Sequence, residues 1–227
     1  MKLLAIDTAN ARCSVAVGQG SEILAEYAID GGYQHAEQLT VLIEQALRTA
    51  AVSMTNLAGI VVSAGPGSYT GLRIGASVAK GLAYGASLPL LAVGTLEMMT
   101  TGFLAAHKVP DDAVLIPLID ARRDEVFAGA YSVQLQELLS PGPVQLKPDS
   151  FDQFSIEKRY FFGSGAPKYS ADFGGAGQLF IEEGYEHAKH LLTIGEKKLN
   201  AGEIENLAYF RPDYRKAFYT THKIKSV

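Results

Sequence analysis

The stretch that decides the fold is residues 63–83, SAGPGSYTGLRIGASVAKGLA. It continues an apolar run, residues 58–64, that predicts a strand covered on both faces. Its glycines permit positive φ and close backbone approach, and Ser68 or Thr70 can cap a following helix. The stretch is not a Walker loop, and Gly71 comes one residue too late for the dinucleotide motif. We expect a strand, a turn and a helix whose N-terminal N–H groups can face an anion.

Upstream of this stretch, three short apolar segments predict an antiparallel meander, at residues 2–7, 13–18 and 22–29. A helix is expected at residues 35–51, because the apolar side chains there form one stripe. Downstream, the pattern predicts a strand at residues 88–93 and a helix at residues 95–106. The order is therefore β-β-β-α-β-α-β-α, which is typical of an α/β fold.

The second half of the chain is less regular. Further strands are expected at residues 113–120, 125–133, 159–163 and 178–181, and a helix at residues 186–200. Pro141, Pro143 and Pro148 indicate loops. We expect two domains: residues 1–105, to which a C-terminal helix at 203–215 can return, and a shorter, degenerate lobe at 106–200.

The composition restricts the class of protein. The chain has 227 residues, 48% apolar and 19% charged, which suffices for a core and excludes a disordered chain. The net charge of −4 argues against a generally basic nucleic-acid surface. The single Cys13 fits a reducing cytoplasm. The N-terminal apolar run ends at Asp7 and is too short for the hydrophobic region of a signal sequence. No apolar run approaches the length of a membrane-spanning helix. We therefore expect a cytoplasmic protein without a membrane segment.

A candidate phosphate site combines the end of the first strand with the glycine-rich turn. An acid and a hydroxyl at a strand end can face a phosphate and its metal, and the turn supplies backbone N–H groups. The alternative is that the acid and hydroxyl only satisfy turn amides. The candidate residues are Asp7, Thr8, Gly65, Gly67, Ser68 and Gly71.

The helix after the turn has a narrow polar ridge, formed by Thr70, Arg73, Ser77, Lys80 and Tyr84. Its other positions are small or apolar, which predicts a helix covered both by its own sheet and by a second surface. The alternative is a central helix wrapped entirely by its own chain. The candidate interface residues, or their support, are Leu39, Leu42, Ile43, Leu72, Ile74, Gly75, Val78, Ala79 and Leu82.

Several motifs along most of the chain resemble the TsaB (YeaZ) family, the bacterial partner in tRNA threonylcarbamoyladenosine synthesis. They are IDTANARCSVAVG (6–18), HAEQL (35–39), the stretch 63–83, IDARRDEVFAGAY (119–131), FFGSGAPKY (161–169) and YFRPDYR (209–215). The resemblance implies the ASKHA (actin/Hsp70/hexokinase-like) fold, with two subdomains, mixed sheets and RNase H-like lobes. That expectation agrees with the element order.

The sequence departs from the catalytic relative, TsaD, which shares the glycine motif and then carries a His-x-x-x-His metal pair. Thr95 and Met99 stand at the corresponding positions, and they are poor substitutes for imidazoles. His187 and His190 are interpreted as a solvated helix face, and the charged turn at residues 120–124 as a salt-bridged surface. We expect no catalytic residue, no metal site and an incomplete nucleotide clamp.

The resemblance thus implies a non-catalytic scaffold or activator subunit that binds TsaD through helices of its N-terminal lobe. A TsaE-like ATPase would join, ATP or ADP would bind at the joint with TsaD, and tRNA would be reached indirectly. Alone, the chain would form a two-fold homodimer. One alternative is a small ASKHA-type ATPase or kinase that uses Asp7, Thr8 and residues 65–71. Another is direct tRNA binding through the basic tail at residues 216–225.

Overall fold

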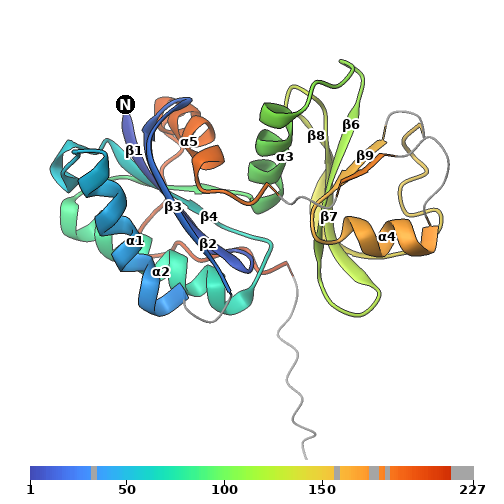
Figure 1. Cartoon of the computed structure of the whole chain (residues 1–227), viewed down its shortest axis with the longest axis horizontal. Coiled ribbons are helices and arrows are strands. Elements are labelled where there is room, and N and C mark those ends of the chain that lie inside the picture. The colour runs from blue at the N-terminus through green and yellow to red at the C-terminus, as the bar shows by residue number, and fades with distance from the viewer. Residues whose placement is uncertain (32–34, 156–158, 174–178, 182–184, 216–227) are drawn as a thin grey trace, which may run out of the picture.

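The structure is a computed structural model that describes residues 1–31, 35–155, 159–173, 179–181 and 185–215. Two five-stranded sheets lie side by side, and helices pack against each of them (Figure 1). The basic tail considered above for tRNA binding lies outside the described residues. Among those described, no helix is both long and apolar enough to cross a bilayer.

The first sheet contains the predicted meander. Its order is β3 (Glu22–Asp30), β2 (Arg12–Gln19), β1 (Lys2–Asp7), β4 (Gly59–Ser63) and β5 (Leu90–Val93). The first three strands pair antiparallel, whereas β1, β4 and β5 are parallel, with Ile6 opposite Val62 and Val62 opposite Ala92. The carboxyl ends of these three parallel strands therefore meet at one edge of the sheet.

Helices cover both faces of this sheet. On one face lie α1 (His35–Thr49) and α2 (Tyr69–Ala86), and on the other lies α5 (Lys189–Ala201) (Figure 1). Strand side chains alternate between the two faces. Leu4 accordingly packs in the cluster that contains Ala79 of α2, and Leu3 in the cluster that contains Leu191 of α5. A 3-10 turn, η1 (Met54–Asn56), precedes β4.

The second sheet is also mixed. Its order is β10 (Leu179–Ile181), β9 (Arg159–Phe162), β6 (Val114–Asp120), β7 (Glu125–Tyr131) and β8 (Glu137–Gln145), and α4 (Ala166–Phe173) packs against it. The predicted pair β6 and β7 is confirmed as antiparallel. The loop predicted around Pro141 and Pro143 is wrong, because these residues lie in β8. Proline is tolerated there because β8 is an edge strand.

Helix α3 (Thr95–Ala106) joins the two halves and lies between the sheets in Figure 1. Met98 packs in the cluster that contains Leu191 of α5, on the first sheet. Phe103, on the other side of the helix, stacks on Phe162 of β9 with ring centroids 4.4 Å apart. The helix is buried on two sides, which is consistent with apolar or small residues at most of its positions.

Two expectations about the end of the chain are wrong. The residues of α5 were assigned to the second lobe, but they pack on the first sheet. Residues 203–215 form no helix. They form a C-terminal strap, in which Glu205 N–H donates to Leu90 O at 2.8 Å and Asp213 N–H donates to Ala64 O at 2.7 Å. Because β5 is an edge strand, its backbone groups are available to the strap, which also forms a turn of its own at residues 206–210.

Candidate functional site

Asp7 and Thr8, at the end of β1, are completely buried. Thr8 Oγ1 donates to Gly71 O at 2.7 Å, and Asp7 Oδ1 accepts from Ala9 N–H at 3.0 Å. Burial raises the pKa of Asp7. Its second oxygen, Oδ2, has no hydrogen-bond partner in the described part of the chain. The Thr8 hydroxyl and one oxygen of the Asp7 carboxyl group therefore bond within the local turn, whereas the second oxygen of Asp7 does not.

The glycines of the turn allow the chain to approach its own backbone closely. A Cβ atom at Gly67 would collide with the carbonyl oxygen of Ala9, and one at Gly71 with that of Thr8. Gly65 has a φ of +112°, and a Cβ atom there would collide with the carbonyl oxygen of Asp213 in the strap. The motif thus joins β1, α2 and the strap at one point.

The first turn of α2 already uses several of its N–H groups. Ser68 caps the helix as predicted, because its Oγ accepts from Gly71 N–H at 3.3 Å. Ser68 N–H donates to Ala9 O at 2.6 Å, and Leu72 N–H donates to Ser68 O at 2.9 Å. The Leu72 bond is the first bond within the helix, so two of the donors that an anion would use, Ser68 N–H and Gly71 N–H, are bonded within the chain.

A cleft lies between the two lobes and consists of two adjoining pockets of about 370 and 510 Å³. Both are lined by Asn10, Ala11, Ile119 and Asp120. The larger pocket also reaches the start of α2 and the β6–β7 turn, through Gly67, Ser68, Tyr69, Thr70 and Arg122. Of the predicted phosphate-site residues, only Gly67 and Ser68 line either pocket.

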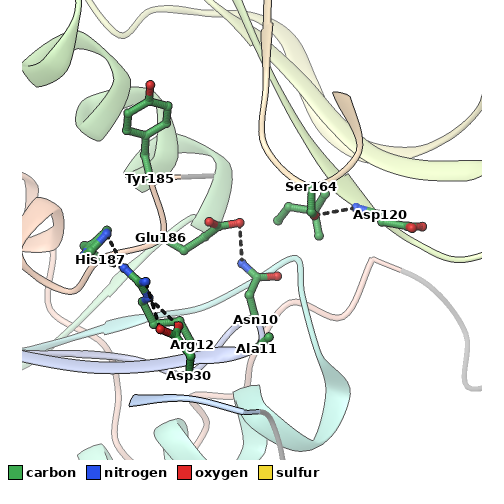
Figure 2. Close-up of a pocket in the computed structure, with 10 residues that line it drawn as sticks. Asn10, Ala11, Arg12, Asp30, Asp120, Ser164, Tyr185, Glu186 and His187 are labelled. Carbon is green, nitrogen blue, oxygen red and sulfur yellow. Dashed lines mark hydrogen bonds and ion pairs between the residues drawn. The ribbon is translucent and has the colours of Figure 1, made fainter. Parts of the chain in front are cut away.

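The smaller pocket is lined by a polar network that the sequence analysis missed (Figure 2). Asn10 Nδ2 donates to Glu186 Oε1 at 3.3 Å. Burial raises the pKa of Glu186 to about 7. Arg12 forms an ion pair with Asp30 at 2.9 Å and contacts His187 Nε2 at 2.6 Å. The network joins residues 10–30 to residues 186–187, which lie more than 150 positions later in the chain, so no local sequence motif indicates it.

The histidines at the start of α5 are not the solvated face that was predicted. His187 Nδ1 lies 3.1 Å from Glu26 Oε1, and its other nitrogen faces Arg12. His190 is half-buried, and burial lowers its pKa to about 4. Asp120, at the start of the charged β6–β7 turn, forms an ion pair with Lys168 of α4.

The structure divides the nine predicted interface residues into two groups. The buried group supports the packing of α1 and α2 on the sheet and contains Leu39, Leu42, Ile43, Leu72, Gly75 and Ala79. Ile74, Val78 and Leu82 are half-buried and follow one another at single-turn spacing along α2. Only this second group can contact a partner directly. Val41 and Tyr84, 43% and 81% exposed, lie on the same two helices and were not predicted.

The polar ridge of α2 is largely exposed, and two of its residues contact the strap. Arg73 Nε donates to Tyr214 Oη at 3.3 Å, and Lys80 Nζ donates to Phe210 O at 3.0 Å. The side of the helix next to this ridge is also open, and Cβ atoms at Gly81 and Gly85 would meet nothing within 4 Å. This side, called the α2 open face below, consists of Ile74, Val78, Gly81, Leu82 and Gly85.

Comparison with known proteins places these features in a family. Residues 30–209 match the family model for TsaD, tRNA N6-adenosine threonylcarbamoyltransferase. The tRNA threonylcarbamoyladenosine biosynthesis protein TsaB of Escherichia coli is 36% identical over 131 residues, which are 58% of this chain and 55% of that protein. The match therefore spans about half the length of this curated relative.

Solved structures resemble the chain over nearly its full length. YeaZ from Pseudomonas aeruginosa gives a TM-score of 0.80 at 26% identity, covering 94% of this chain and 99% of that one. The activator of 2-hydroxyisocaproyl-CoA dehydratase from Clostridium difficile, solved with bound ADPNP, gives 0.51 at 9% identity, covering 91% and 99%. The second likeness concerns the fold alone. The expected ASKHA fold with two mixed sheets is confirmed.

Proposed function

The chain belongs to the TsaB (YeaZ) family of tRNA threonylcarbamoyladenosine biosynthesis, and we propose that it is a non-catalytic subunit that binds and activates a TsaD-like transferase. The α2 open face is the proposed docking surface. The observation that carries this proposal is the uncovered glycine pair, Gly81 and Gly85, next to a half-buried apolar stripe. Small residues let a partner helix approach closely, and the stripe supplies apolar area to bury.

The environment of the residues that replace the metal-binding histidines supports a non-catalytic role. Met99 is fully buried and packs with Phe103 and Phe162 between α3 and the second sheet. The Thr95 side chain is also fully buried. Asp7, the one acid of the predicted phosphate site, is sealed beneath the turn. The transferase subunit would therefore supply the metal and the chemistry.

The remaining assembly follows from this assignment. A TsaE-like ATPase joins the pair, ATP or ADP binds at the joint with the transferase, and tRNA contacts the complex through the transferase. Without its partner, the chain pairs with a second copy through the same open face, since an apolar surface favours being covered. The proposed place of action is the cytoplasm.

Reconstitution tests the proposal. Purified TsaD-like and TsaE-like subunits, tRNA and substrates should form threonylcarbamoyladenosine only when this chain is added. The Asp7→Asn variant should activate as well as the wild type, because the carboxylate takes no part in the chemistry. Activity of the other subunits without this chain, or its loss in Asp7→Asn at unchanged stability, would contradict the proposal.

A second candidate function is a small ATPase or kinase of the same fold. The interlobe cleft favours it, because the larger pocket brings the Ser68 and Thr70 hydroxyls near the cationic Arg122. Calorimetric titration of the isolated chain with Mg-ATP separates the two functions. Tight binding with turnover, lost in Arg122→Gln, would support the enzyme and contradict the scaffold.

A further inference from the structure

Two segments of this acidic chain are basic. Residues 211–227 contain five lysines or arginines and one acid, although the chain as a whole carries a net charge of −4. No Asp or Glu occurs from residue 45 to residue 96, so α2 carries Arg73 and Lys80 without an acid of its own. The remainder of the chain is therefore more acidic than the total charge indicates, and a polyanion would be directed to these two segments.

The fold brings the two basic segments together. Lys80 Nζ donates to Phe210 O at 3.0 Å, and Arg73 Nε donates to Tyr214 Oη at 3.3 Å. Arg211 follows Phe210 directly, and both Arg211 and Arg73 are exposed. The strap and the polar ridge of α2 thus form one continuous surface that bears three cations.

These three cations keep donors for a ligand. An ammonium has three N–H donors and a guanidinium five, and the contacts with the strap use one donor each of Lys80 and Arg73. Neither these two nor Arg211 forms an ion pair with another described residue. Asp213 of the strap is already paired, with Arg215. The positive charge of the surface is therefore not neutralised within the described chain.

Tyrosine rings accompany the cations. The rings of Tyr69 and Tyr214 have centroids 4.7 Å apart, and the guanidinium carbon of Arg73 lies 4.5 Å from the centroid of the Tyr69 ring. Tyr209, beside Phe210 in the strap, is 83% exposed. An aromatic ring that makes so little use of its apolar surface within the fold is available for stacking.

A hollow of about 330 Å³ lies along the strap at Tyr209 and Arg211. The amide of Asn206 and the carboxyl groups of Glu205 and Asp213 also line it. The lining thus combines an aromatic ring and a cation with polar groups that can hydrogen-bond the edge of a base.

Single-stranded RNA fits this combination better than an anionic membrane does. Cations bind phosphates, and unpaired bases stack on aromatic side chains. A membrane-binding helix would instead place apolar side chains opposite a cationic face, whereas the ridge between Arg73 and Lys80 holds Ser77. The seven positions from Arg73 to Lys80 span about 10 Å of helix, which is roughly three nucleotide rises of about 3.4 Å.

We propose that Arg73, Lys80, Arg211 and Tyr209 form a ridge–strap surface that binds a single-stranded segment of RNA. The three cations contact phosphates, and a base stacks on Tyr209. This contact adds to the one that the transferase makes with tRNA, and it lies beside the α2 open face. It is a property of this chain alone, so a test without the transferase does not depend on the proposed docking.

Fluorescence anisotropy of a labelled single-stranded RNA of about ten nucleotides tests the proposal with the full chain at several salt concentrations. The logarithm of the affinity should fall with the logarithm of the salt concentration with a slope of about −2, because each of three phosphate contacts contributes about 0.7. Arg211→Gln should weaken binding about fivefold and reduce the magnitude of the slope by about 0.7. Lys108→Gln removes one charge from an exposed position after α3 and should change neither quantity.

The contribution of Tyr209 has a different signature. Tyr209→Ala should weaken binding at least fivefold at an unchanged slope, because a stacked base and no phosphate contact is lost. Tyr209→Phe keeps the ring and should bind like the wild type. Absence of RNA binding at low salt, or equal losses in Arg211→Gln and Lys108→Gln, would overturn the proposal. Binding to phosphatidylserine vesicles without binding to RNA would assign the surface to a membrane and would also overturn it.

Discussion

The ammonium of Lys80 in α2 donates a hydrogen bond to the carbonyl oxygen of Phe210 in the C-terminal strap, at 3.0 Å. This contact joins residues 130 positions apart. It holds the strap against the side of α2 that bears the polar ridge and leaves Gly81 and Gly85 uncovered.

Removal of the Lys80 side chain tests whether this hydrogen bond holds the strap in place. We expect Lys80→Ala to lose about 1 kcal/mol of stability, since a charged donor to a backbone carbonyl is removed. The amides of Glu205 and Asp213, which pair with the first sheet, should exchange faster. Lys108→Ala, at an exposed position after α3, is the control. Unchanged protection of the strap in Lys80→Ala would show that the contact does not hold it.

Substitution of two glycines of α2 by alanine should change the stability of the protein in opposite directions. At Gly71 a Cβ atom would collide with the carbonyl oxygen of Thr8, so Gly71→Ala should destabilise the protein by about 2 kcal/mol or more. At Gly81 nothing lies within 4 Å, so Gly81→Ala should stabilise the helix by about 0.5–1 kcal/mol. Chemical denaturation measures both. Equal effects at the two positions would contradict the assignment of Gly71 to close packing and Gly81 to the surface.

The buried carboxyl of Asp7 predicts a pH dependence of stability. Burial raises its pKa in the folded state above the ordinary 3.8, so the unfolded state loses the proton first as the pH rises. This group therefore lowers stability as the pH increases above 3.8. Asp7→Asn keeps an acceptor for Ala9 N–H, and its stability relative to the wild type should grow from pH 4 to pH 7. A relative stability that falls over this range would show that the carboxylate has a stabilising partner.

The sequence predicted what local patterns encode. The meander, the turn and α2 follow from period-two and helical spacing around residues 63–83, and Ser68 is the expected cap. Strand β8 was missed because Pro143 indicates a loop unless the strand is known to lie at an edge. The strap was not predicted because the backbone partners of Glu205 and Asp213, Leu90 and Ala64, lie far away in the sequence, and its own hydrogen bonds form only a turn at residues 206–210.

The candidate site depends even more on tertiary contacts, which local sequence patterns do not encode. The spacing of apolar residues predicted which helices form the proposed interface. It could not predict that Ala79 is buried while the adjacent Val78 is half-buried. The contact between Arg12 and His187 could not be predicted, since the two residues are 175 positions apart and meet only in the folded chain. Contacts of this kind depend on tertiary position rather than on motif.

The affinity of the chain for a purified TsaD-like subunit tests the central claim most directly. Calorimetry should compare the wild type with Gly81→Arg, which places a long cation on the α2 open face, and with Ala105→Arg, which places the same cation on an exposed position of α3. We predict that Gly81→Arg weakens binding by at least 100-fold while Ala105→Arg binds like the wild type. Binding of the folded Gly81→Arg variant with wild-type affinity would contradict the claim that this face receives the partner.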